Sequence, residues 1–266
     1  MGKKMKNAPV YFVLAQVRFN AVLTLDSYVP AIQDALRKAG YADFAKLMIS
    51  TVNLNLGVPA TANQMPVAQT ARYLFLNEKK FSGFLLDQAS LIFQTTEYET
   101  FDPFRDAFLL GLKTLNESVG GLSFCERIGI RFLDAIIPNP NEKITDYLAP
   151  SLVGLLDKLN ERQLKHVISE TWSTSDQANL MCRAVIQDQT AKGVSFAPDL
   201  QPMLLQVAEK FRETSGIYGI IDTDAWYENR QKFDIDKIKE KLISLHGDVR
   251  DSFDEMVTPH AFSVWE

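Results

Sequence analysis

Three arginines and a glutamine stand where two strands are expected, and together they could bind an anion. Arg127 and Arg131 flank Gly129 in ERIGIRFLDAI and share a strand face, because alternate side chains point the same way. Gln16 and Arg18 lie in the more polar half of another expected strand. Guanidinium groups bind carboxylate or phosphate through paired hydrogen bonds, and glycine allows close approach to the backbone. If the strands are neighbours, the arginine-lined sheet face is a candidate site for a nucleotide or nucleic acid.

The same arginines also have a purely structural interpretation. They could pair with acidic residues on a solvated sheet face, and the candidates are Glu126, Asp134 and Asp102. Exposed ion pairs of this kind contribute little to stability and need no ligand to explain them. We favour this interpretation and keep the anion-binding groove as the alternative.

Two aspartates in IIDTDAW form a second candidate site. Asp222 and Asp224 are two residues apart, so on a strand their carboxylates point the same way. Paired carboxylates can hold Mg²⁺ or divide the roles of acid and base, which suggests a metal-dependent hydrolase or nuclease. A metal site of this kind needs a third ligand, and Glu170 and Asp188 are the candidates. The sequence does not show that either of them lies near the two aspartates. We favour turn-forming aspartates at a strand end.

The histidines and cysteines do not form a recognisable catalytic or zinc pattern. The chain has three histidines and two cysteines, without HExxH, CxxC or a Cys/His cluster. Cys125 and Cys182 lie in apolar surroundings, where an isolated cysteine is usually a core residue. Nucleophile-elbow, P-loop, dinucleotide-binding and kinase signatures are not found. We therefore assign no catalytic residue and no cofactor.

The end of the chain is a third candidate, this time for binding a partner. Phe262, Val264 and Trp265 follow a long amphipathic segment as an apolar tail. Exposed apolar tails can dock on a partner protein. We favour the alternative, in which the tail folds back on the sheet.

Composition limits the classes of function that remain. The 266 residues are 46% apolar and 23% charged, which suits a large packed core. The net charge of −5 disfavours attraction of nucleic acid by the whole surface. The absence of a disulfide framework predicts a reducing compartment. The apolar run of Val10–Ala15 is too short for a signal peptide or a membrane span, so we expect a cytoplasmic protein without membrane association.

The first half of the chain must position the arginines. Alternation or apolar runs predict strands over Val10–Phe19, Phe44–Val52, Ala71–Asn77, Ser82–Leu86, Ser90–Thr95 and Glu126–Ile136. The short gaps between the middle strands predict an antiparallel meander. Apolar residues at helical spacing predict helices that begin near Asp26 and Asp102, the second with Phe104, Phe108, Leu112 and Leu115 on its buried stripe.

The second half is expected to repeat this plan in outline. We predict a helical connection over DYLAPSLVGLLDKL, and strands over Leu164–Trp172, Ala178–Asp188 and Tyr218–Trp226. Residues 197–211 are ambiguous between strand and helix. The last expected element is a helix of about seven turns over FDIDKIKEKLISLHGDVRDSFDEMV, capped by Asp234 and followed by Pro259. The fold class is α+β, with a largely antiparallel sheet covered by helices. Residues 1–140 and 141–266 would be two similar units packed as one body.

Three blocks of sequence carry a resemblance to a known family. APVYFVLAQVRF, YETFDPFRDAF with ERIGIRFLDAI, and IIDTDAW with LHGDVRDSFDEMVTPHAF resemble a sporadically distributed, functionally unassigned family of bacterial proteins of about this length. The family's motifs match Pro9–Phe19, Tyr98–Phe108, Arg127–Phe132 and Leu245–Thr258, and nothing matches between 140 and 215. The resemblance brings no catalytic residues. It implies a setting such as antiviral defence, a toxin-related locus or a mobile element.

These observations together favour a non-enzymatic binding or interaction protein. We expect it to act through a protein partner or as a homodimer. The alternatives are a nucleic-acid or nucleotide binder that uses Gln16, Arg18, Arg127 and Arg131, and a metal-dependent hydrolase or nuclease that uses Asp222 and Asp224.

Overall fold

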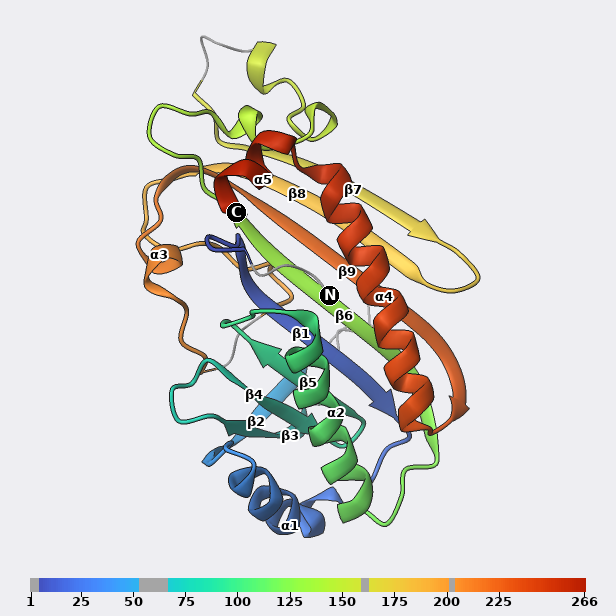
Figure 1. Ribbon diagram of the computed structural model, residues 1–266. Helices are drawn as coiled ribbons and strands as arrows, with labels where there is room; N and C mark the ends of the chain where they lie inside the picture. Colours follow the sequence, from blue (N-terminus) through green and yellow to red (C-terminus); the bar gives the residue numbers. More distant parts are fainter. Residues whose placement is uncertain (1–4, 53–66, 159–162, 201–203) are drawn as a thin grey trace, which may run out of the picture.

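A nine-stranded antiparallel sheet organises the part of the chain that the structure describes. The computed structural model describes residues 5–52, 67–158, 163–200 and 204–266 (Figure 1). The strands follow the order β2-β3-β4-β5-β1-β6-β9-β8-β7 in the sheet. They are β1 (Val10–Phe19), β2 (Asp43–Val52), β3 (Val67–Leu76), β4 (Ser82–Asp87), β5 (Ser90–Thr95), β6 (Phe124–Ile136), β7 (His166–Thr174), β8 (Asn179–Gln189) and β9 (Gly216–Lys232). The predicted α+β class with an antiparallel sheet is confirmed.

Strand β1 lies at the centre of the sheet because both of its faces are apolar over its first half. It pairs with β5 on one side and with β6 on the other, antiparallel in both cases. A bulge between Val10 and Phe12 interrupts the pairing with β6. As a result Tyr11 packs with Phe12 on the same side of the sheet, whereas Val13, Ala15 and the alternate residues that follow pack under the helices.

Three helices cover one face of the sheet (Figure 1). They are α1 (Leu25–Lys38), α2 (Phe101–Ser118) and α4 (Ile235–Met256). The predicted stripe of α2 is buried, and it packs with Ile128, Ile130 and Phe132 of β6 in one core cluster. Gly111 lets α2 approach the sheet closely, since a Cβ there would lie 2.1 Å from Cε1 of Phe84. The even positions of β6 are therefore its helix-covered side.

Helix α4 begins and ends where its apolar pattern predicts, whereas the short helix that follows it was not predicted. Asp234 caps α4 as expected, and its carboxylate accepts hydrogen bonds from the backbone N–H groups of Asp236 and Lys237. The helix ends at Met256, and α5 (Pro259–Trp265) begins after Thr258, whose hydroxyl accepts from the Ala261 N–H. Proline cannot extend the hydrogen bonding of α4, so Pro259 starts a new helix instead. Among the described residues, no helix is long and apolar enough to cross a membrane.

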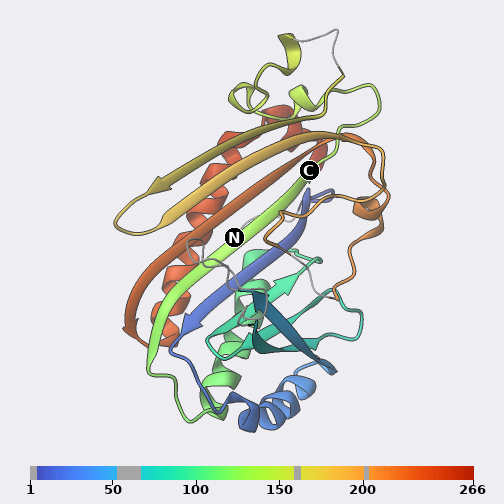
Figure 2. The same ribbon diagram turned by 180° about the vertical axis from the view of Figure 1, so that it is seen from behind.

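The opposite face of the sheet carries irregular chain in place of a long helix (Figure 2). The ambiguous segment 197–211 runs here and contains only the start of α3 (Glu209–Arg212) as regular structure in its described part. Phe211 and Leu205 from this segment pack against Tyr11, Phe12 and Tyr218. The segment thus buries apolar residues without helix or strand periodicity. Because α3 is a single turn and none of the longer described helices lies on this side, we call it the helix-free face.

The predicted helical connection after β6 is a series of single turns. It contains the 3₁₀ turns η1 (Ile144–Asp146), η2 (Pro150–Leu152) and η3 (Leu156–Lys158). Pro150 lacks a backbone N–H, and Gly154 adopts a φ of 58°, so a continuous α-helix is broken at both residues. The proposed boundary near residue 140 falls between β6 and η1. The first half contributes six described strands and the second half three, and the two halves share the sheet through β6 and β9.

Candidate binding site on the helix-free face of the sheet

A cavity of about 520 Å³ lies on the helix-free face, and we call it the polar pocket. Strands β1 to β6 and β9 contribute to its lining, together with residues 198–200. Its apolar wall includes Phe12, Leu14, Leu85 and Ile92. Its polar wall includes Gln16, Gln94, Arg127, Arg131 and Asp224. Residues of both candidate sites from the sequence thus meet in one pocket.

The register between β1 and β6 brings the predicted arginine group together. Arg18 pairs with Arg127, and Gln16 pairs with Gly129. Arg18 is exposed, and its guanidinium lies 3.6 Å from a carboxylate oxygen of Glu228 at the outer end of the group. Arg18 is absent from the pocket lining, whereas Gln16, Arg127 and Arg131 belong to it.

Arg131 is held by two aspartates. Its Nε and Nη2 donate to the two carboxylate oxygens of Asp222 at 2.7 and 2.8 Å, and its Nη1 donates to Asp199 at 2.6 Å. Arg183 reaches the same Asp222 at 3.5 Å. The side chains of Arg131 and Asp222 are 7% and 3% exposed. This is a buried bidentate ion pair, which positions its members and leaves little of the guanidinium for a ligand.

The partners that the sequence suggested for the arginines were wrong. Glu126 and Asp134 occupy even positions of β6, and Asp134 lines a cavity on the helix-covered side. Asp102 lies in the first turn of α2 and accepts from Arg105 at 2.7 Å. The real partners come from β9 and from residues 198–200, far away in sequence. Acidic residues do pair with these arginines, as expected, but they are not the residues that the sequence suggested.

Gly129 makes room for the guanidinium of Arg127 itself. A Cβ at position 129 would lie 3.0 Å from Nη1 of Arg127. The same Nη1 donates to Oε1 of Gln16 at 2.6 Å, and the group lies 5.5 Å from the ring centroid of Trp226. Asp224 is 3.8 Å from Nη2. The glycine that could have admitted a ligand is therefore covered by an arginine of the same strand.

The charges of the helix-free face are nearly balanced. Five arginines of this face each have a carboxylate within 4 Å: the pairs are Arg18–Glu228, Arg72–Asp87, Arg127–Asp224, Arg131–Asp199 and Arg183–Glu170. Asp222 adds a further negative charge. These described side chains together carry no excess of positive charge with which to attract a polyanion. Burial raises the pKa of Asp224 to about 6, although Arg127 and Arg131 oppose this shift.

Asp222 is poorly suited to hold a metal ion. Both of its carboxylate oxygens already accept from Arg131, and Arg183 adds positive charge close by. Within the described ranges, no group of three or more histidine, cysteine or acidic side chains is arranged to hold a metal. Glu170 is bonded to Arg183 at 2.6 Å. The residues present therefore do not fit the magnesium site that IIDTDAW suggested.

Gln94 is a pocket residue that the sequence reasoning missed. It is 3% exposed, and its Nε2 has no hydrogen-bond partner in the part of the chain that the structure describes. An unpaired buried donor costs about 1–3 kcal/mol. A glutamine directly after the apolar run Leu91–Phe93 was the available signal. The pocket thus offers a free amide donor beside balanced charges, which suits a compact uncharged or zwitterionic ligand.

The apolar tail folds back on the protein. Trp265 is 4% exposed and packs against Tyr147 and Phe253. Phe262 is half-buried, and its ring contacts those of Phe253 and Trp265. The tail that could have bound a partner is part of the core in the form of α5, so Trp265 offers no surface for docking.

The cysteines and His246 are also core-like. Burial raises the pKa of Cys125 to about 11 and raises that of Cys182, so both thiols are protonated at neutral pH. His246 stacks on Phe101 with 3.9 Å between ring centroids, and burial lowers its pKa to about 4. None of these environments activates a nucleophile.

Strand β7 forms an open edge of the sheet (Figure 1). Among the described strands it pairs only with β8. Ile168 and Trp172 are 60% and 61% exposed. The strand HVISETWST contains no proline and no lysine, the residues that commonly protect sheet edges from pairing. The ring of Trp172 packs edge to face on that of Trp226, with 5.7 Å between ring centroids. The apolar edge therefore continues into the helix-free face.

Comparison with known proteins does not add an identity. No protein-family model matches the chain, and no curated protein matches it. The resemblance to an unassigned bacterial family therefore stays a prediction.

Proposed function

We propose that the protein is a non-enzymatic interaction protein that binds a second copy of itself through strand β7. The observation that carries this proposal is the open edge of β7, with two large apolar side chains exposed on a nine-residue strand. Unpaired N–H and C=O groups along an edge strand form a template for another strand. Association in this way would join the sheets of two copies.

The sequence of β7 is self-complementary in an antiparallel arrangement. If Glu170 faces Glu170 of the second copy, Ile168 faces Trp172 of the second copy and the reverse. Cross-strand pairs between an aromatic and a β-branched residue stabilise antiparallel sheets. Each Glu170 carboxylate is already neutralised by Arg183 and accepts from Nε1 of Trp172 at 2.8 Å, which reduces the repulsion between the two copies. All nine residues of the strand pair in this register.

The balanced charges favour this function over the binding of nucleic acid. The arginines of the helix-free face already pair with carboxylates, whereas no described strand pairs with the outer edge of β7. The setting implied by the resemblance, a bacterial defence or mobile-element system, is part of the proposal and is tested by the genes that neighbour this one.

Light scattering coupled to size-exclusion chromatography tests the proposal. We expect a mass of twice 30.0 kDa for the wild type and 30.0 kDa for the variant with both Ile168→Lys and Trp172→Lys. Ile243→Lys is the matched control, because Ile243 is also an exposed apolar residue but lies on α4. A wild type that stays monomeric at the highest concentration reached, or a double variant that stays dimeric, contradicts the proposal.

The polar pocket supports a second candidate function, the binding of a small zwitterion. The unpaired Nε2 of Gln94 is the specific observation in its favour. A thermal-shift comparison of free amino acids with nucleoside phosphates tests it. Stabilisation by an amino acid that is lost in Gln94→Leu supports the candidate, and equal stabilisation of both proteins counts against it.

A further inference from the structure

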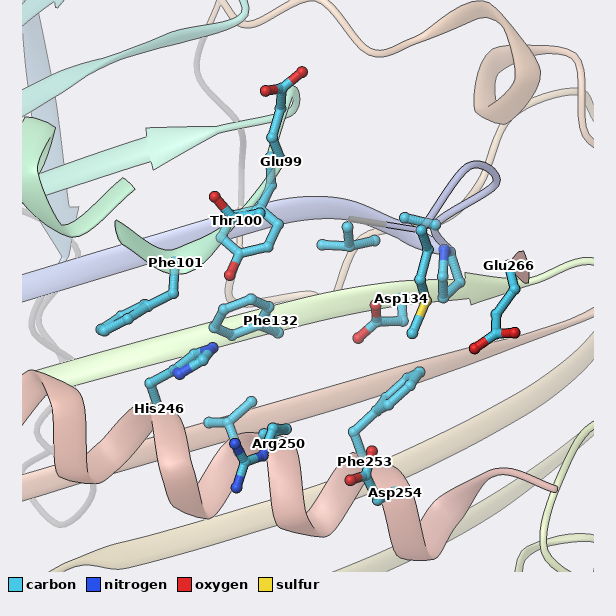
Figure 3. Close-up of a pocket in the computed structure, with 16 residues that line it drawn as sticks. Glu99, Thr100, Phe101, Phe132, Asp134, His246, Arg250, Phe253, Asp254 and Glu266 are labelled. Carbon is cyan, nitrogen blue, oxygen red and sulfur yellow. The ribbon is translucent and has the colours of Figure 1, made fainter. Parts of the chain in front are cut away.

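A second cavity of about 330 Å³ lies on the helix-covered side of the sheet, and we call it the aromatic pocket. It is bounded by the start of β1, by β6, by residues 98–101 and by α4 (Figure 3). Its walls are formed mainly by the rings of Tyr98, Phe101, Phe132, His246 and Phe253. Nothing in the self-association proposal depends on this cavity.

Asp134 contributes a carboxyl group to this apolar cavity and points into it (Figure 3). Its place follows from the register of β6, in which Asp134 pairs with Val10 on one side and Ile221 on the other. The residue is 6% exposed. Its pKa is shifted by burial and by the charge of Asp222, and no hydrogen bond from the described chain contributes to the shift. The carboxyl group faces the cavity (Figure 3), so its oxygens can accept hydrogen bonds from a ligand there.

The rings of the pocket are arranged in contact with one another around this acid. Tyr98 meets Phe132 edge to face with 5.2 Å between ring centroids. His246 is stacked on Phe101 and lies 5.9 Å from the ring of Phe132. Because burial keeps His246 uncharged near neutral pH, its ring adds an aromatic surface without a positive charge. Aromatic surfaces that face a carboxyl group provide the combination that attracts organic cations.

We propose that the aromatic pocket binds an organic ammonium ligand, whose ammonium group pairs with Asp134 and whose apolar body packs against Tyr98, Phe132 and His246. An ammonium group donates to both oxygens of an ionised carboxylate, and such charge-assisted hydrogen bonds are the strong ones. A simple metal ion suits the pocket less, because one carboxyl group among rings offers too few oxygen ligands.

The protonation of Asp134 gives the proposal a measurable signature. Burial and, to a lesser degree, the charge of Asp222 raise its pKa to about 8, so the ligand-free carboxyl is mostly neutral at pH 7. An ammonium ligand must displace this proton, whereas a ligand with a carbonyl or carboxylate would accept a hydrogen bond from it. The affinity for an ammonium ligand therefore rises with pH, and the affinity for an acceptor falls.

Other titratable or charged groups near Asp134 come from every element around it. From α4, the end of the chain, the segment before α2, and β1 and β9, they are His246, Arg250, Asp254, Glu266, Tyr98, Glu99, Tyr11 and Asp222. His246 titrates near pH 4, and burial raises the pKa of Tyr98 and Tyr11 above the usual tyrosine value. These shifts move the titration of His246 and the two tyrosines away from the range between pH 7 and pH 9, in which Asp134 changes charge.

Isothermal titration with phenethylammonium tests the proposal, with 2-phenylethanol and phenylacetate as matched neutral and anionic probes. We expect the affinity for phenethylammonium to rise about tenfold from pH 7 to pH 9, with release of about 0.9 proton per ligand at pH 7. The proton count follows from titrations in two buffers of different ionisation enthalpy. The alcohol should bind more weakly and without this pH dependence.

Two variants separate the role of Asp134 from general effects on the pocket. Asp134→Asn preserves the shape of the neutral acid, so the protein should fold, lose at least tenfold in affinity for phenethylammonium and lose the pH dependence. Asp254→Asn removes an exposed acid from the same cavity and should change the affinity less than twofold. Failure of phenethylammonium to bind, an affinity that falls with rising pH, or equal binding by Asp134→Asn would overturn the proposal.

Discussion

Removing the guanidinium of Arg131 should destabilise the protein far more than removing a guanidinium at the edge of the same group. In Arg131→Met the aliphatic part of the side chain is retained, and the two hydrogen bonds to Asp222 are lost. Asp222 is left 3% exposed, with Arg183 at 3.5 Å as its nearest remaining cation. Asp199 loses a partner as well, but it is exposed and can be solvated.

The magnitude follows from the burial of the carboxylate. Removal of one partner of a buried ion pair costs about 3–5 kcal/mol, because the other charge stays buried without compensation. Since Arg183 supplies part of that compensation, we expect the lower end, about 3 kcal/mol. In Arg18→Met, by contrast, the lost pair with Glu228 is exposed on both sides, so the expected cost is about 0–1 kcal/mol.

Urea unfolding of the two single variants, of Asp222→Leu and of Arg131→Met with Asp222→Leu measures these terms. The double variant should be more stable than Arg131→Met alone, because it no longer buries a lone charge. A cost below about 1 kcal/mol for Arg131→Met, equal to that of Arg18→Met, would refute the reasoning, since the ion pair would then behave like a solvated surface pair. Additive effects in the double variant would refute it as well.

Four further predictions concern packing, the polar pocket, pH and charge. Gly111→Ala should cost about 2 kcal/mol or more in thermal unfolding, because the new Cβ overlaps the ring of Phe84, whereas Gly247→Ala meets no neighbour and should be tolerated. Gln94→Leu should stabilise the protein by about 1 kcal/mol in urea unfolding if its donor stays unpaired, and a loss of stability would contradict this. The pKa of Asp134, about 8 when folded, lies above its unfolded value, so its protonation stabilises the fold at low pH and this contribution is lost as pH rises. Between pH 5 and 8, stability relative to Asp134→Asn should therefore fall by up to about 1.4 kcal/mol per pH unit, and a parallel pH profile of the two proteins would disprove it. Single-stranded DNA should not bind in fluorescence anisotropy at low salt. Binding that weakens with added salt and in Arg18→Met would instead support the alternative of an arginine-lined groove for nucleic acid.

Elements with strong local patterns could be predicted from the sequence. The short gaps around Ser82–Asp87 and Ser90–Thr95 leave no room for a crossover, so the meander was predicted correctly. The steps of three and four residues from Ile235 to Met256 predicted α4, and Asp234 and Pro259 correctly marked its limits. By contrast, β9 extends to Lys232, past the predicted end at Trp226, since pairing with Phe124 and its neighbours on β6 supports a polar and exposed continuation. Local pattern carries no information about such a distant partner.

The candidate site was predictable to a similar degree. Alternation along β6 correctly placed Arg127 and Arg131 on one face, and pairing with β1 brought Gln16 beside them. The acids that neutralise them could not be chosen, because Asp199 lies in an irregular segment and Asp222 depends on the pairing of β9 with β6. Asp134 was suggested as a partner of Arg127 and Arg131. Its even position in β6, however, places it on the side of the sheet opposite to these two arginines.

The central place of β1 matters during synthesis of the chain. This strand leaves the ribosome before every other described strand, yet Val17 pairs with Leu91 on one side and with Ile128 on the other. Strand β6 in turn pairs with β9, which is synthesised later and contains Ala225 opposite Ile130. The partners of β1 are therefore complete only once Ile136 has been translated, about half of the 266 residues, and those of β6 only after Lys232. Contacts between such distant segments slow folding, so the apolar residues of β1 stay exposed for longer than in a protein whose neighbouring strands pair in order.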